Sequence, residues 1–138
     1  MFAKPFGSYV CPGDTITCDV GPFEVTARIE YDHDYRIGDD DVHNADNATD
    51  AERDRIENAL RAYYRDEWFY CGLVLSVSLN DHVIEDHAAS LWGIEANYPG
   101  SDNAYLLEVA NDLLPEAMDV ARATLDNIVA AYMAERNK

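Results

Sequence analysis

The side chains best suited to metal chemistry are four histidines, three cysteines and many carboxylates. His82 and His87 enclose Glu85 and Asp86, which suggests a ligand cluster. A zinc helix, however, needs histidines at i and i+4, and on a strand residues five apart face opposite sides. The cysteines also lack metal-knuckle spacing. We therefore expect no metal site.

A second candidate is the acidic stretch from Asp32 to Asp54. Its nine acidic and two basic residues give a net charge of −7 over 23 residues. The densest part is Asp39, Asp40 and Asp41. Carboxylates bind calcium, but this stretch lacks the ligand order and the turn glycine of an EF-hand. We interpret it as a solvated loop whose three clustered aspartates could face a partner.

Motifs for covalent or phosphate chemistry are missing from the sequence. It contains no G-x-S-x-G turn for a nucleophilic serine and no glycine-rich phosphate loop. Carboxylates are so numerous that no pair stands out as an acid and a base. We therefore expect a protein that is not an enzyme and needs no cofactor.

One row of carboxylates has a regular spacing. The steps of 4, 4, 3 and 7 residues keep one face of a helix, and the members are Glu108, Asp112, Glu116, Asp119 and Asp126. With a rise of ~1.5 Å per residue, charges recur about every 6 Å. A DNA strand carries one phosphate per ~3.4 Å of its axis. The row predicts a nucleic-acid mimic, although the outward face of any helix in so acidic a protein is also acidic.

The elements that would position this row are strands followed by helices. Alternation of apolar and polar residues predicts strands over 14–20, 23–31 and 68–79, with a less regular return strand to residue 97 that is bulged near Ala88 or Gly93. Thr49 and Glu52 form a capping box before a helix. Two further helices are expected after residue 100, and Pro115 should either kink the helix or stand at the first position of a new one, because proline lacks an amide hydrogen.

The expected order is β-β-α-β-β-α-α, in one domain spanning residues 1–138. We predict an α+β fold with one four-stranded, mostly antiparallel sheet and helices packed on one face. The predicted core is Ile16, Val25, Ile29, Leu60, Leu73, Leu75, Val77, Leu91, Ile94, Leu106, Val109, Leu125 and Ile128. Trp68, Tyr70 and Val74 share the opposite face, which is either covered by helices or open to a partner or a homodimer.

Composition limits the partners. The net charge is −17, from 27 acidic and 10 basic residues, and such a surface repels nucleic acid and anionic membranes. We therefore predict no direct nucleic-acid binding and no membrane association. Three cysteines without framework spacing indicate a reducing compartment, and the first residues do not form a signal peptide. These features predict a cytoplasmic protein.

The segment from Glu67 to Met118, with the motifs SLWGIE and YLLEVANDLLPEA, resembles a group of small uncharacterised acidic proteins of bacteriophages and plasmids. The resemblance implies a setting and no residue roles, because mobile elements often encode small acidic inhibitors of host defence. We therefore hypothesise a nucleic-acid-mimicking inhibitor of antirestriction or anti-CRISPR type, whose partner is a basic nucleic-acid-binding protein of the host. The alternative is a structural or regulatory interaction protein of a mobile element, whose acidity serves only solubility or high-salt adaptation.

Overall fold

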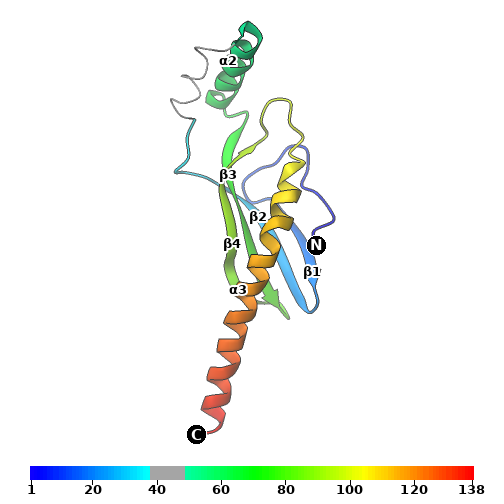
Figure 1. Ribbon diagram of the computed structural model, residues 1–138, viewed down its shortest axis with the longest axis vertical. Coiled ribbons are helices and arrows are strands. Elements are labelled where there is room, and N and C mark those ends of the chain that lie inside the picture. Colours follow the sequence, from blue (N-terminus) through cyan, green and yellow to red (C-terminus); the bar gives the residue numbers. More distant parts are fainter. Residues whose placement is uncertain (38–48) are drawn as a thin grey trace.

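The computed structural model describes residues 1–37 and 49–138, and it has the predicted α+β class (Figure 1). Four antiparallel strands form one sheet in the order β1-β2-β3-β4. The strands are β1 (Thr15–Val20), β2 (Phe23–Tyr31), β3 (Phe69–Leu79) and β4 (His82–Ala96). The helices in these residues are α2 (Asp50–Tyr64) and α3 (Tyr105–Arg136). Neither is long and apolar enough to cross a membrane.

The two hairpins follow from the alternation of apolar residues. The fully buried residues of β2 and β3 pair across the sheet: Val25 with Val77, Ala27 with Leu75, and Ile29 with Leu73. Asn80 and Asp81 make the β3–β4 turn with positive φ angles of 49° and 64°, which asparagine and aspartate tolerate better than most residues. This agreement between period and burial explains why the sheet was predictable.

Strand β4 is bulged at both expected places. Its register against β3 shifts between Cys71 and Leu73 and again between Leu75 and Val77. Gly93, near the first shift, has a φ of 72°, a conformation that glycine adopts without strain. Leu91 was predicted to lie in the core, but it is 47% exposed because β4 is the edge strand.

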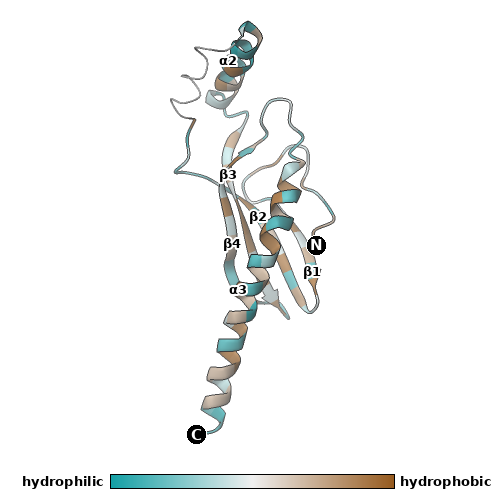
Figure 2. Cartoon of the chain, viewed as in Figure 1, coloured by the Kyte–Doolittle hydropathy of each residue, from teal (hydrophilic) through white to brown (hydrophobic). Residues whose placement is uncertain are grey.

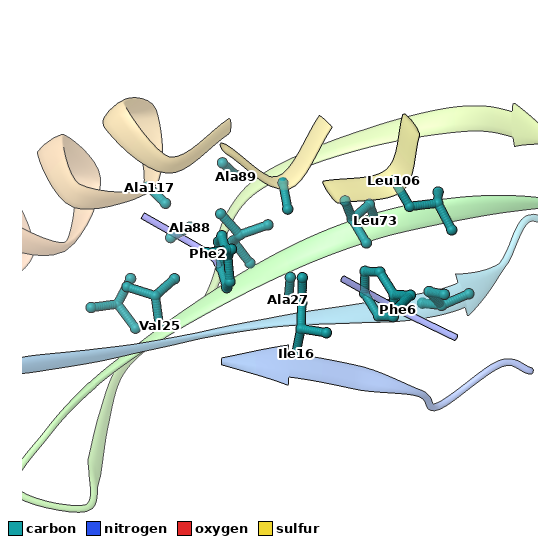
Figure 3. Close-up of a cluster of buried hydrophobic side chains, with 14 of the residues drawn as sticks. Phe2, Phe6, Ile16, Val25, Ala27, Leu73, Ala88, Ala89, Leu106 and Ala117 are labelled. Atoms are coloured by element: carbon teal, nitrogen blue, oxygen red, sulfur yellow. The ribbon is translucent and has the colours of Figure 1, made fainter. Parts of the chain in front are cut away.

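Helix α3 lies across the inner face of the sheet, where it buries Leu106, Ala110, Ala117, Met118 and Ala121 (Figure 3). The predicted break at Pro115 is wrong, because the proline lies inside one continuous helix. The Pro115 side chain is exposed. The backbone carbonyl four residues before it, which has no amide hydrogen to accept, therefore lies on the side of the helix that water reaches. The described residues therefore hold two helices instead of three.

Several other predicted core residues are less buried than expected. Ile128 is exposed because α3 continues past the sheet, and Leu60, Val109 and Leu125 are half-buried. Tyr31, at the end of β2, is also exposed, although it continues the alternation of apolar residues along this strand.

The N-terminal segment, predicted to be an irregular arm, supplies three core residues: Phe2, Phe6 and Val10. Asparagine side chains take the place of a neighbouring strand for its backbone. Asn111 accepts from the Phe2 amide at 2.8 Å and donates to the Phe2 carbonyl at 3.1 Å. Asn97 does the same for Val10, with both distances 2.8 Å. The N-terminal segment is thereby fixed beside α3, and its phenylalanines join the core (Figure 3).

The predicted capping box of α2 is confirmed: Thr49 accepts from the Glu52 amide, and Glu52 accepts from the Thr49 amide. In contrast to the prediction, α2 does not lie on a face of the sheet. It extends past one end of it (Figure 1). Trp68 donates from Nε1 to the Ala59 carbonyl at 2.8 Å and packs with Tyr70 and Ala62 in a small second core. The face with Trp68, Tyr70 and Val74 is therefore covered, and the alternative of an open aromatic patch is wrong.

Leu75 is fully buried in the middle of β3, so Leu75→Ala should lower the free energy of unfolding by about 2–5 kcal/mol through lost burial and a cavity. Val83→Ala is the matched control, since Val83 is exposed and should change stability by less than about 0.5 kcal/mol. Urea unfolding followed by circular dichroism measures both. Equal effects of the two variants would contradict the core assignment.

Candidate partner-binding surface

The five carboxylates of the predicted row lie on α3, and all are exposed: Glu108, Asp112, Glu116, Asp119 and Asp126. At 100° per residue they fall within an arc of roughly 80°, opposite the residues that α3 buries against the sheet. Figure 2 shows hydrophilic residues recurring along this helix. Because Pro115 does not interrupt the helix, the row is continuous over about 27 Å. We call these five residues the α3 acidic row.

The row carboxylates form no ion pairs in the described residues, although Arg122 lies one turn from both Asp119 and Asp126. In residues 1–37 and 49–138 the ion pairs are Arg28 with Glu30, Arg28 with Asp86 and Lys138 with Glu135, and none includes a row carboxylate. Like charges one turn apart destabilise a helix by a few tenths of a kcal/mol per pair. The packing of α3 against the sheet overcomes this cost and holds Glu108, Asp112, Glu116 and Asp119 in a fixed array, and Asp126 follows on the part of α3 beyond the sheet.

The other predicted positions do not join this array. Asp39, Asp40 and Asp41 lie outside the described residues. In the segment considered as a metal cluster, Glu85 accepts from the Thr124 hydroxyl at 2.5 Å, while Asp86 pairs with Arg28. No group of three or more metal-binding side chains occurs in the described parts of the chain.

The sequence did not predict a hollow of about 780 Å³ on the outer face of the sheet. It lies between Pro12 and Gly13 on one side and Tyr31, Tyr35 and Trp92 on the other. The indole of Trp92 lies over Gly72 so closely that a Cβ atom at residue 72 would be 2.2 Å from the ring. Glycine at this strand position therefore makes room for the tryptophan, a pairing that the alternation pattern alone does not reveal.

Asp32 closes one wall of the hollow and is buried. Its carboxylate accepts backbone N–H bonds from Asp34 at 2.9 Å, Tyr35 at 3.0 Å and Gly93 at 2.9 Å. Burial alone would raise the pKa of Asp32, but these three donors outweigh it and hold the pKa below its ordinary value. Through these three hydrogen bonds the Asp32 carboxylate connects the segment after β2 to the bulge of β4 at Gly93.

Two features of β3 and β4 could suggest catalysis, a histidine–serine contact on β4 and the buried thiol of Cys71 in the main core. His87 Nε2 and Ser90 Oγ are 2.8 Å apart, but Trp92 Nε1 also donates to this Oγ at 3.1 Å. An activated serine further requires a third group that orients the histidine, and in the described residues His87 has no such hydrogen bond. Burial raises the pKa of the Cys71 thiol to about 12, so it is not a nucleophile at neutral pH. The hydrogen bonds of Ser90 therefore have a positional role.

Comparisons with protein-family models, curated proteins and solved structures find no match to this chain. Function must therefore be argued from the geometry of the described surfaces.

Asp32→Asn should lower the free energy of unfolding by about 1–3 kcal/mol at neutral pH, because the amide of the asparagine side chain would face the Gly93 N–H. Asp32 has a lowered folded pKa, so its stabilisation is complete above the ordinary pKa and is lost as pH falls through the folded value. The difference from the wild type should thus shrink below about pH 4.

Urea unfolding at several pH values measures this dependence. The matched control is Asp34→Asn, which changes an exposed carboxylate two residues away and should have little effect at any pH. A stability difference for Asp32→Asn that stays constant down to low pH would contradict the role assigned to the charged carboxylate.

Proposed function

We propose that this protein is a non-enzymatic acidic binding protein that occupies a basic nucleic-acid-binding surface of another protein. Inhibition of a host defence system, of the antirestriction or anti-CRISPR type, is the setting that we favour. The proposal rests on one observation, the α3 acidic row of five exposed carboxylates on a single continuous helix.

The physical basis is competition for arginine and lysine side chains. Guanidinium and ammonium groups that meet phosphates bind carboxylates by the same charge-assisted hydrogen bonds. The row offers a charge about every 7 Å along the helix on average, which a cationic groove built for a phosphate strand can contact repeatedly. Because α3 is packed on the sheet, little conformational entropy is lost when the partner binds.

The alternative, a structural or regulatory interaction protein, would use apolar contacts. Trp92 is 42% exposed beside the hollow on the outer face, and this observation supports the alternative. Trp68, which we had considered for this role, is buried. Under this alternative the acidic surface contributes solubility alone.

A charge-reversal variant tests the proposal. Replacing Glu108, Asp112, Glu116 and Asp119 with lysine should abolish capture of the partner from a host lysate, since the attraction becomes repulsion. Duplex DNA added to the wild-type complex should displace the partner, and binding should weaken steeply with salt because exposed charges are screened within ~8 Å.

The control variant carries the same change in net charge elsewhere, at four exposed acids of β1, β2 and α2: Asp19, Glu24, Asp54 and Glu57. It should retain the partner, and circular dichroism should show both variants folded. Trp92→Ala tests the alternative in the same assay. Retention of the partner by the row variant, together with its loss in Trp92→Ala, would reject mimicry in favour of an apolar contact.

A further inference from the structure

The last part of α3, residues 126–136, follows the last contacts with the sheet, which are those of Thr124 and Leu125, and runs on as a free helical arm (Figure 1). Four large apolar side chains on it are at least half exposed: Ile128 at 52%, Val129 at 50%, Tyr132 at 57% and Met133 at 50%. A helix of about 11 residues without packing is marginally stable in water. This arm therefore carries an apolar face with no cover from the described parts of its own chain.

That face continues the seam by which α3 is packed on the sheet. The seam advances in steps of 3, 4, 3 and 4 residues through Met118, Ala121, Leu125, Ile128 and Tyr132. Met118 and Ala121 are buried, Leu125 is half-buried, and the last two are exposed. This is the spacing with which helices pair in coiled coils. The core of the molecule thus extends into a surface suited to another helix.

The distribution of net charge along the chain indicates which helix could pair with this surface. Residues 126–138 contain Arg136 and Lys138 against Asp126 and Glu135, hence +2 − 2 = 0. Since the whole chain carries −17, residues 1–125 carry all of it. A second copy of this chain would be repelled from the rest of the molecule, and the arm is where that repulsion is absent.

We propose that the arm pairs with the arm of a second copy in an antiparallel, two-fold symmetric dimer. If the axis passes between Ile128 and Val129, Leu125 of each copy lies level with Tyr132 of the other. The acidic bodies, which end at Leu125, then lie at opposite ends of the paired arms, about 10 Å apart along the helix axis, which exceeds the ~8 Å screening length. A parallel pair would place the two bodies side by side. This dimer stands independently of the proposed function.

Sedimentation equilibrium of the full chain tests the pairing. The wild type should approach twice the mass of the chain as concentration rises, and Ile128→Asp should weaken self-association at least about tenfold by placing a charge in the seam. The matched control, Ala130→Asp, adds the same charge on the opposite face of the arm and should still dimerise.

Tyr132→Asp provides a second seam variant, and circular dichroism verifies that each variant folds. A wild type that stays monomeric at all concentrations, or seam and control variants that behave alike, would overturn the proposal.

Orientation is tested by disulfide formation on a Cys11→Ser background. An equimolar mixture of Leu125→Cys and Tyr132→Cys chains should give the mixed disulfide under mild oxidation, because these positions face each other only in the antiparallel pair. Leu125→Cys chains that crosslink with themselves more readily than with Tyr132→Cys chains would show a parallel pair and overturn the proposed arrangement.

Discussion

The close packing of α3 on the sheet is the constraint on which the rest of the structure depends. Ala110, Ala117 and Ala121 have no exposed surface, and their small side chains let the helix backbone approach the strands. Because this face must point inward, the carboxylates on the other side of the helix must point outward. The same contact fixes Asn111, which binds the backbone at Phe2 and so brings the N-terminal segment into the core. Sheet, N-terminal segment and acidic row are thus consequences of one interface.

Most of the sheet and one helix start could be predicted from the sequence, because local pattern and final environment agree there. In β2 the alternate residues Phe23, Val25, Ala27 and Ile29 are both apolar and buried, so the period of two predicts the face correctly up to the exposed Tyr31 at the strand end. The capping box depends only on Thr49 and Glu52, three residues apart. The face of the α3 acidic row was also predictable, since helical spacing alone determines which residues share it.

The features that the sequence did not reveal depend on contacts between distant residues. Phe2 and Phe6 belong to no regular alternation of apolar residues. They are buried because asparagine side chains about a hundred positions away form hydrogen bonds with the backbone of the N-terminal segment. The hollow on the outer face requires Asp32 to meet the Gly93 amide, 61 residues along the chain. Pro115 illustrates a different limit: tertiary packing on both sides of a proline can preserve a helix that its local chemistry disfavours.

The attachment of α2 has a consequence for the dynamics of the molecule. This helix buries only Ala59 and Ala62, and the aromatic residues that hold it form a cluster separate from the main core. Separate cores allow separate opening events, so α2 can detach and re-form while the sheet stays intact. Its amide hydrogens should therefore exchange with solvent deuterium through local opening, whereas those of β3 should exchange only when the whole domain unfolds. We therefore expect two cooperative units within one chain.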